Sequence, residues 1–377
     1  MNYTVFISYS AILVLSVDSQ IFPAILSQLK GTSFQQGILL SALFFFFPIA
    51  AAGIGMLSDR IGKRPVLVAG SFLMAVPFII SSITGNYWII ILGVLLFGIG
   101  MGTVEGQTSA LLSDSYPGKE RSIMNISQTF FSIGAAGGPF LITLFYLVVP
   151  KMKLESIFTS AAITTIILSV GFSLLKTREA KNKALQRILI SHLKDDGIWK
   201  FLAASLFIYV ASEMGTVSWL AKYGHLFLGL SVETAPVCIT LFWAGLGISR
   251  LTVGTLFQKF SSRNILLLSM TVTLIFQILT FLTLNPWIAL PSILFIGIGM
   301  GPIWPTIVSI GGARYSGSNG FAVGALVAMG GLAVSLVQPL IGFLATDSIL
   351  GLRFTLLSLS LLTIWNIIRI KNMYSLH

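Results

Sequence analysis

Long apolar runs, each about the length needed to cross a lipid bilayer, fill almost the whole chain of 377 residues. A membrane-spanning helix needs roughly 20 predominantly apolar residues, and charge clusters and turn residues divide this sequence into twelve such runs. Only 9% of the residues are charged, against about 25% in soluble domains, and no long polar stretch is left for a second, soluble domain. We therefore expect an all-α polytopic membrane protein with spans at 5–27, 34–57, 65–84, 87–113, 122–148, 155–175, 199–222, 234–257, 264–284, 287–312, 319–345 and 350–370.

The reactive residues exclude several classes of protein. The only cysteine, Cys238, rules out a disulfide framework and a cysteine-based metal site. The three histidines are scattered without the spacing of metal ligands, and no nucleophile–base pair or phosphate-binding loop is present. We predict no metal, no cofactor and no enzymatic activity. The net charge of +11 is explained by membrane topology, so we expect no nucleic-acid partner.

The distribution of Lys and Arg predicts the orientation in the membrane. With both termini inside, 17 of the 23 basic residues fall in inner loops and five in outer loops, as the positive-inside rule requires. The sequence thus predicts a multi-pass protein of the plasma (cytoplasmic) membrane, the inner membrane of the cell, with both termini cytoplasmic. The one extended polar stretch has leucines and isoleucine at helical spacing among its bases, which is typical of a helix on the membrane surface. We expect an N-terminal six-helix bundle at 1–175, a cytoplasmic linker with an interfacial helix at 176–198 and a C-terminal six-helix bundle at 199–377.

The two halves of the sequence are related by an internal repeat. Residues 55–64 align without gaps on 254–263, and Gly98-Ile-Gly-Met-Gly102 recurs as Gly297-Ile-Gly-Met-Gly301, both 199 residues later. Two parallel six-helix repeats are the arrangement of the major facilitator superfamily, whose substrate site lies near the membrane midplane. Gly-Met-Leu-Ser-Asp-Arg-Ile-Gly-Lys-Arg at 55–64 resembles the superfamily's signature between its second and third helices. The resemblance covers the whole chain and implies two pseudo-symmetric bundles.

This loop motif predicts a gate at the inner face. Glycines 55 and 62 would permit a tight turn and close helix approach, and the charged residues could form an ion-pair latch. Asp114 is a partner for Lys63 or Arg64 at the inner end of the fourth span. The alternative is that these are solvated loop charges that only fix topology, because surface ion pairs are weak. The candidate gate residues are Gly55, Asp59, Arg60, Gly62, Arg64, Asp114 and Arg250, the last of these as a gate or helix-end residue.

Three acidic residues lie well inside predicted spans: Asp18, Glu105 and Glu213. A charge at the bilayer centre costs upward of about 2.5 kcal/mol, so such residues normally line a cavity or relay protons. We expect them to be proton-coupling residues. Each has a structural alternative: Asp18 as a cap for a break near Pro23, Glu105 as a packing partner of neighbouring glutamines, and Glu213 as an interhelical hydrogen-bonding residue.

The polar side chains available for a substrate are neutral. Amides hydrogen-bond hydroxyl groups in both senses, indole rings stack on sugar C–H faces, and no central Lys or Arg suits an anion. An organic cation could use the acids and aromatics instead, and each of these residues could simply serve packing. The candidate substrate-binding residues are Gln20, Gln107, Asn125, Gln128, Trp219, Trp243, Gln277, Trp304 and Gln338.

Four strings resemble the fucose:proton symporter family, which includes bacterial fucose, glucose and mannose carriers. They run from Gly100 to Asp114, from Asn125 to Pro139, from Tyr209 to Leu220, and from Phe242 to Arg250. The resemblance implies that an acid on the first helix and an acid on the fourth, here Asp18 and Glu105, bind the proton.

The leading hypothesis is therefore proton-coupled symport of a neutral, hydroxylated solute, a monosaccharide, by alternating access. The partners would be this small molecule, protons and the lipid bilayer, and we expect the chain to act as a monomer. A proton-coupled efflux antiporter for apolar or cationic compounds would use the same acids in the opposite direction. A membrane receptor or scaffold is a third hypothesis, since fold alone does not prove function, although no soluble signalling domain is evident.

Overall fold

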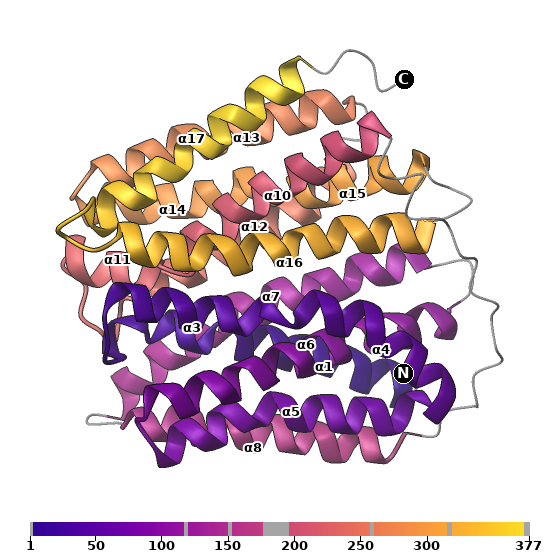
Figure 1. Ribbon diagram of the computed structural model, residues 1–377. Helices are drawn as coiled ribbons and strands as arrows, with labels where there is room; N and C mark the ends of the chain where they lie inside the picture. The colour runs from indigo at the N-terminus through magenta and orange to yellow at the C-terminus, as the bar shows by residue number, and fades with distance from the viewer. Residues whose placement is uncertain are drawn as a thin grey trace. The chain divides into compact units, whose positions relative to one another are not determined.

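The computed structural model describes residues 3–116, 120–149, 153–175, 196–256, 260–314 and 319–372. In these ranges the regular secondary structure is helical throughout (Figure 1). Eleven helical stretches are long and apolar enough to cross a membrane, and a shorter apolar stretch at Val237–Thr252 completes the set. The prediction of an all-α polytopic membrane protein with twelve transmembrane helices is confirmed. The expected linker helix lies outside the described residues.

The spans of the first half follow the predicted apolar runs closely. Their bounds are α1 (Tyr3–Ser19) followed by α2 (Ile21–Ala24), α3 (Ser33–Phe45) followed by α4 (Phe47–Ile61), α5 (Lys63–Ile83), α6 (Tyr87–Ser115), α7 (Glu120–Val148) and α8 (Leu154–Ser173). A short 3₁₀ helix, η1 (Leu26–Gln28), lies between α2 and α3.

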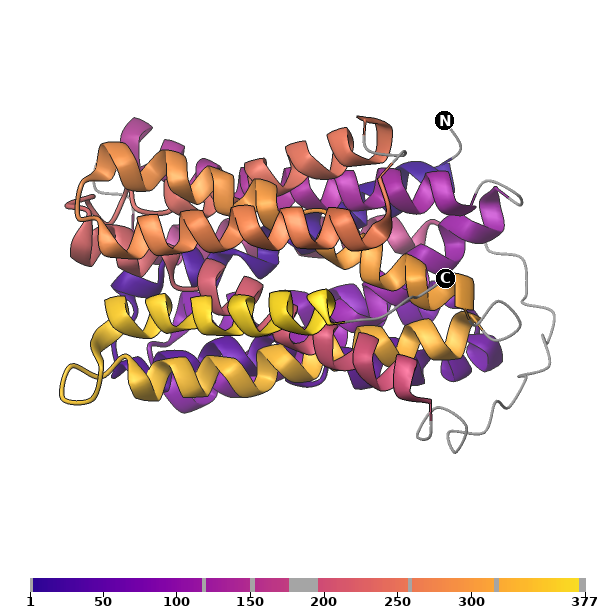
Figure 2. The ribbon, with the colours of Figure 1, turned by 90° about the horizontal axis from the view of Figure 1, so that it is seen from above.

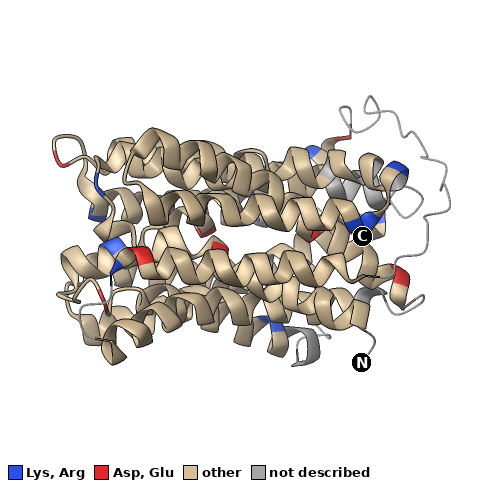
Figure 3. Ribbon diagram, turned by 90° about the horizontal axis from the view of Figure 1, so that it is seen from below, with Lys and Arg blue, Asp and Glu red and all other residues tan. Residues whose placement is uncertain are grey.

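The second half repeats this order of spans. Its helices are α10 (Gly197–Val217) followed by α11 (Leu220–Phe227), α12 (Val237–Leu256), α13 (Ser262–Leu282), α14 (Pro286–Met300) followed by α15 (Ile303–Arg314), α16 (Asn319–Leu344) and α17 (Gly351–Lys371). Figure 2 shows the long orange helices of this half running side by side. Lys, Arg, Asp and Glu gather mainly at the helix ends (Figure 3), as expected for helices whose middles lie in hydrocarbon.

The chain divides into two compact units. One comprises Met1–Phe22 and Leu39–Ala184, and the other comprises Pro23–Ile38 and Leu185–His377. The second unit thus includes residues Pro23–Ile38, which belong to the predicted N-terminal bundle at 1–175. The start of α3 is attached to this unit by hydrogen bonds from Lys222 of α11 to Ser33 and Gln36, and by the close approach of Gly37 to the Gln338 carbonyl oxygen of α16.

The repeated glycines explain why the two halves pack alike. A Cβ on Gly98 would lie 2.9 Å from the Leu43 carbonyl oxygen of α3, and one on Gly100 would lie 2.4 Å from the Gly70 carbonyl oxygen of α5. Their repeat partners, 199 residues later, do the same: a Cβ on Gly297 would lie 2.0 Å from the Phe242 carbonyl oxygen of α12, and one on Gly299 would lie 2.5 Å from Thr273 Oγ1 of α13. Glycine therefore lets α6 and α14 each pack closely against two neighbours.

The starts of α6 and α14 are also equivalent. Asn86 accepts hydrogen bonds at its side chain from the backbone N–H groups of Trp88 and Ile89, and Asn285 accepts one from Trp287. An asparagine at this position satisfies N–H groups that have no partner within the helix. The two asparagines are again 199 residues apart, so the duplication extends to helix capping.

Several spans are interrupted, and the sequence explains two of the breaks. Pro48 stands at the start of α4, and Pro302 lies between α14 and α15. Proline has no N–H group and its ring hinders the carbonyl four residues earlier, so it tends to break a helix. A break within a membrane leaves backbone groups that other parts of the protein must satisfy. At such breaks we therefore expect polar side chains to hydrogen-bond the exposed backbone groups.

Candidate functional site

Asp18 is buried at the end of α1, where the helix gives way to α2. Its side chain is 1% exposed, and Thr165 of α8 donates a hydrogen bond from Oγ1 to its Oδ2 across 2.7 Å. Among the described residues, this hydroxyl is its hydrogen-bonding partner and no Lys, Arg or His forms an ion pair with it. The carboxyl group is thus available for a proton in a way that an ion-paired acid would not be.

Close packing of α7 on α1 fixes the position of this acid. A Cβ on Gly134 would lie 2.0 Å from Ser16 Oγ and 2.5 Å from the Leu13 carbonyl oxygen, and one on Gly138 would lie 3.1 Å from the Val17 carbonyl oxygen. No larger residue fits at Gly134 without moving α1. Gly134 and Gly138 therefore serve the packing of α7 against the part of α1 that precedes Asp18.

Glu105 lies on α6, which packs against α1 and α4. It is half-buried, and the described residues give it no hydrogen-bonding partner. Glycines flank it: a Cβ on Gly102 would lie 2.4 Å from the Phe47 carbonyl oxygen, and one on Gly106 would lie 3.4 Å from that of Ala51. The acid is therefore held on a closely packed part of α6, and no ion pair involves it among the described residues.

Gln107 stands two residues further along α6 and is 5% exposed. Its Oε1 is buried and accepts no hydrogen bond from the described residues. A buried polar atom without a partner costs about 1–3 kcal/mol, so a donor from a bound molecule would be favoured here. Of the predicted substrate residues, Gln107 has the clearest unused hydrogen-bonding capacity.

Three further predicted substrate residues lie in the same unit. Gln20 is buried and donates from Nε2 to Ser19 Oγ across 3.1 Å. Gln128 is half-buried on α7. The side chain of Asn125 lies outside the described residues.

Glu213 lies on α10 in the second unit and is 6% exposed. Tyr209, one turn earlier, donates from its hydroxyl to Glu213 Oε1 across 2.5 Å. Arg250 of α12 donates from Nε to the Gly301 carbonyl oxygen across 3.4 Å, and the Tyr209 hydroxyl lies 3.1 Å from the carbonyl oxygen of the preceding residue, Met300. Glu213 therefore has a different environment from Asp18 and Glu105, with a hydroxyl partner and a nearby cation.

Trp219 and Gln338 are predicted substrate residues that bind each other. The indole Nε1 donates to Gln338 Oε1 across 2.7 Å, and Gln338 Nε2 donates to the Met214 carbonyl oxygen at 2.8 Å and to Ser218 Oγ at 3.0 Å. Both side chains are fully buried. Gln338 thus satisfies polar groups at the break between α10 and α11, which is a structural use of this amide.

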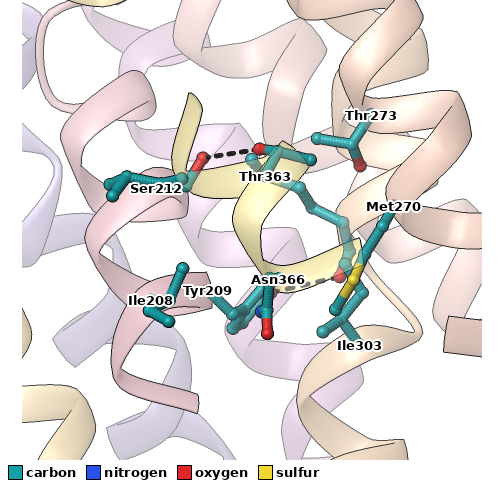
Figure 4. Close-up of a pocket in the computed structure, with 10 residues that line it drawn as sticks. Ile208, Tyr209, Ser212, Met270, Thr273, Ile303, Thr363 and Asn366 are labelled. Atoms are coloured by element: carbon teal, nitrogen blue, oxygen red, sulfur yellow. Dashed lines mark hydrogen bonds between the residues drawn. The ribbon is translucent and has the colours of Figure 1, made fainter. Parts of the chain in front are cut away.

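Gln277 is likewise engaged, in a network between α10, α13 and α17. Its Nε2 donates to Ser212 Oγ at 3.1 Å and Thr216 Oγ1 at 3.3 Å, and its Oε1 accepts from Thr363 Oγ1 at 2.9 Å. Ser212 and Thr363 also bond to each other across 3.3 Å (Figure 4). The amide lies in the interior of this unit and has both of its polar atoms satisfied.

The other two tryptophans among the predicted substrate residues, Trp243 and Trp304, also pack within the second unit. Trp243 is 4% exposed and meets Phe242 edge to face with ring centroids 5.6 Å apart. Trp304 of α15 is half-buried, and a Cβ on Gly330 of α16 would lie 3.0 Å from its ring. Glycine at 330 therefore makes room for this indole.

The gate motif forms the tight turn that the glycines predicted. Gly62 has φ of 90° between α4 and α5, a conformation that other residues rarely adopt. Lys63 Nζ lies 2.6 Å from Asp114 Oδ2, so Lys63 and not Arg64 takes the predicted ion pair. Arg60 and Arg64 are exposed. Gly55 and Asp59 lie within α4, and the side chain of Asp59 lies outside the described residues.

Reasoning from the sequence missed three important partners. Thr165 was not singled out, because its pairing with Asp18 joins residues 147 positions apart. Tyr209 could have been found, because the spacing of i and i+4 to Glu213 places both on one helix face. Lys222 was assigned to topology alone, but it bonds to Gln36 and Ser33.

A duplicated set of six membrane-spanning helices, with buried acids and amides among them, defines a polytopic membrane protein of the transporter class. The sequence matches the Major Facilitator Superfamily over residues 5–338. The chain belongs to this superfamily, whose members are transporters and not enzymes.

Curated relatives are distant and differ in what they carry. The class H tetracycline resistance protein of Pasteurella multocida is 24% identical over 281 residues, which cover 70% of this chain and 67% of that protein. The chain spans 58% and 59% of the lengths of two other relatives.

Solved structures of the same fold include two transporters. The Escherichia coli fucose:proton symporter FucP superposes with a TM-score of 0.68 at 18% identity, covering 98% of this chain and 99% of that one. A variant of the nucleoside transporter NupG gives a TM-score of 0.81 at 13% identity, covering 99% and 100%. The predicted resemblance to the fucose:proton symporter family is confirmed at the level of fold.

Proposed function

We propose that this protein is a secondary transporter that carries a neutral, hydroxyl-rich solute, a monosaccharide, together with a proton. The observation that carries the proposal is the buried carboxyl group of Asp18, which has a hydroxyl partner and no cation to hold it ionised among the described residues. An acid of this kind on a membrane-spanning helix is typical of a proton-binding site. Glu105 on the adjacent helix is the second proton-binding residue.

The solute would bind to neutral hydrogen-bonding groups. Gln107 offers a buried amide oxygen without a partner among the described residues, and Gln20, Asn125 and Gln128, which lie in the same unit, are the remaining ligands that we propose. We assign Trp219, Gln277 and Gln338 a structural role within the second unit, because their polar atoms are already hydrogen-bonded to one another or to neighbouring helices. A neutral polar solute agrees with the carbohydrate and nucleoside carriers that share the fold.

Transport would proceed by alternating access in the plasma membrane with both termini in the cytoplasm. Protonation of the acids and binding of the solute would favour each other, since linkage between two ligands is reciprocal. The ion pair between Lys63 and Asp114 would belong to the inner gate. We propose that the monomer is the transporting unit.

The proposal is tested by measuring pH outside proteoliposomes when hexoses, pentoses and deoxy-sugars are added in turn. Symport predicts alkalinisation with one class of sugar and its loss in Asp18→Asn and Glu105→Gln. Glu155→Gln is the matched control, because Glu155 is an exposed acid in the first turn of α8. An unchanged proton signal in both acid variants would rule out these residues as the coupling site.

Proton-coupled efflux of apolar or cationic compounds is the second candidate. The similarity to a tetracycline resistance protein over 70% of the chain favours it. It predicts drug resistance on expression and proton movement opposite to that of the drug, without sugar binding. Silence across the sugar panel together with drug-driven proton movement would establish the antiporter and refute symport.

A further inference from the structure

The hydroxyl group of Tyr209 lies between two acceptors in the interior of the second unit. Its oxygen is 2.5 Å from Glu213 Oε1 and 3.1 Å from the Met300 carbonyl oxygen. Tyr209 is 3% exposed and Glu213 is 6% exposed. A phenol has one hydrogen to donate, so it cannot donate to both acceptors at once.

The protonation state of Glu213 decides which acceptor receives that hydrogen. When Glu213 is ionised, Tyr209 donates to the carboxylate and the Met300 carbonyl loses this donor. When Glu213 is protonated, the acid O–H donates to the tyrosine oxygen, and the tyrosine is free to donate to the Met300 carbonyl. The added proton stays on Glu213, and the phenol is neutral in both states.

Met300 is the last residue of α14, at a break in the span. Gly301 and Pro302 follow, and α15 begins at Ile303. The helix is interrupted at 301–302, and Pro305, four residues after Gly301, has no N–H to donate to the Gly301 carbonyl, so carbonyl groups here need other partners. Tyr209 supplies one for Met300, and Arg250 Nε lies 3.4 Å from the carbonyl oxygen of Gly301. Side chains from α10 and α12 thus hold two consecutive carbonyl groups at the break.

The break also contacts α12 directly. A Cβ on Gly301 would lie 2.0 Å from Ser249 Oγ and 2.7 Å from the Leu246 carbonyl oxygen. A change in the hydrogen bonding of Met300 would therefore alter the packing of Gly301 against α12. It would also alter the hydrogen bond from Arg250, the residue after Ser249, to the Gly301 carbonyl.

Few charged or titratable groups lie around Glu213 in the described part of the chain. They are Tyr209, on the same helix, and Arg250 of α12. Of the helices that pack against α10, α16 carries no charged residue. The charged residues of α15 and α17 lie in the first or last turn of each helix. These end residues are Arg314, Arg353, Arg369 and Lys371.

A small cavity adjoins the tyrosine and offers room for water. The centre of a water molecule can occupy about 10 Å³ of it, which is about what one water needs. Its walls include Met300 together with Tyr209, Ser212 and Asn366 (Figure 4). Asn366 is 2% exposed, and its Oδ1 accepts no hydrogen bond from the described residues. Asn366 Oδ1 could thus accept a hydrogen bond from a water molecule in the cavity next to Tyr209.

We propose that Glu213, Tyr209 and the Met300 carbonyl form a proton switch inside the second unit that sets the conformation of the break between α14 and α15. Protonation of Glu213 forms the hydrogen bond from Tyr209 to the Met300 carbonyl, and deprotonation of Glu213 breaks it. The proposal deepens the proton coupling proposed above and rests on it for its place in transport. It assigns the switch to residues distant in sequence from Asp18 and Glu105.

The test uses the full chain in lipid and needs no solute. Infrared difference spectra between acidic and basic pH should contain the C=O band of a protonated acid that Glu213→Gln removes and Tyr209→Phe shifts to higher frequency. The emission of Trp304, obtained by subtracting spectra of Trp304→Phe, should report the break. We expect its pH dependence to be lost in both Glu213→Gln and Tyr209→Phe.

Tyr223→Phe is the matched control. The hydroxyl of Tyr223 is also buried between two acceptors, the carbonyl oxygens of Thr280 and Thr283, and neither is titratable. This variant should keep the acid band and the pH-dependent emission. If Tyr209→Phe behaves like Tyr223→Phe, the switch is refuted.

The switch and the proposed symport fail in different ways. A titrating Glu213 band with coupled Trp304 emission, but no proton movement with any solute, would retain the switch and refute symport. Solute-driven proton movement with an unchanged stoichiometry in Glu213→Gln, and no pH-dependent emission in the wild type, would retain symport and refute the switch.

Discussion

The ammonium group of Lys222 donates a hydrogen bond to Gln36 Oε1 across 2.6 Å, joining the start of α3 to α11 within the second unit. The same nitrogen lies 3.1 Å from Ser33 Oγ and 5.5 Å from the centre of the Trp219 ring. Gln36 extends the contact, because its Nε2 donates to the carbonyl oxygens of Leu26 and Leu29. One lysine therefore attaches the segment 26–36 to α11, the helix whose N-cap is Trp219.

Replacing this lysine by methionine keeps its length and removes the charge. Because hydrogen bonds to charged groups contribute about 1.5–3 kcal/mol when protected from water and Lys222 is half-buried, we expect Lys222→Met to lower the free energy of unfolding by about 1–2 kcal/mol. The measurement is the midpoint of thermal unfolding in detergent. Lys153→Met is the control, since Lys153 is exposed, and an equal change in both variants would contradict the attachment.

The hydrogen bond from Thr165 to Asp18 leads to a second prediction. Thr165→Val keeps the shape of the side chain and removes the donor, which should cost about 0.6–1.7 kcal/mol as an interhelical hydrogen bond and reduce coupled uptake. Thr143→Val is the control, because Thr143 Oγ1 is buried without a partner among the described residues and should be neutral or stabilising. Unfolding midpoints and uptake are measured in parallel for the two variants. Coupled uptake that survives intact in Thr165→Val would show that Asp18 does not need this hydroxyl.

The close approach of α6 to α5 leads to a third prediction. A Cβ on Gly100 would lie 2.4 Å from the Gly70 carbonyl oxygen and 2.8 Å from the Met74 amide nitrogen, so Gly100→Ala must move one helix and should cost about 1–3 kcal/mol. Gly137→Ala is the control, because a Cβ there would have no neighbour within 4 Å. Expression level and thermal unfolding check the pair. A Gly100→Ala protein as stable as Gly137→Ala would show that α6 is free to shift.

The spans, the duplication and the tight turn at Gly62 could be predicted from the sequence, because hydropathy, a fixed repeat offset and glycine preferences are local properties. The ion pair of Lys63 with Asp114 was one of two alternatives and is now resolved. Contacts such as those of Thr165 with Asp18 and Trp219 with Gln338 could not be predicted. They depend on which helices become neighbours and on their rotation, and neither is specified by one sequence without aligned relatives.

The pairing of Trp219 with Gln338 explains why residue type alone overstated the substrate site and leads to a final prediction. An amide and an indole in a membrane span resemble sugar ligands, yet here Gln338 Oε1 accepts from the indole at 2.7 Å while its Nε2 bonds to Met214 and Ser218. Gln338→Leu would leave the indole N–H and the Met214 carbonyl without this partner, which should destabilise the protein by about 1–3 kcal/mol. Gln107→Leu removes an amide oxygen that has no partner among the described residues and should instead raise the KM for the solute while leaving unfolding nearly unchanged. Thermal unfolding and uptake kinetics of the two variants separate the roles. Loss of a solute ligand changes the KM, whereas loss of a structural hydrogen-bonding residue changes the unfolding midpoint. The reverse pattern, with Gln338→Leu stable and weak in binding, would return Gln338 to the substrate site.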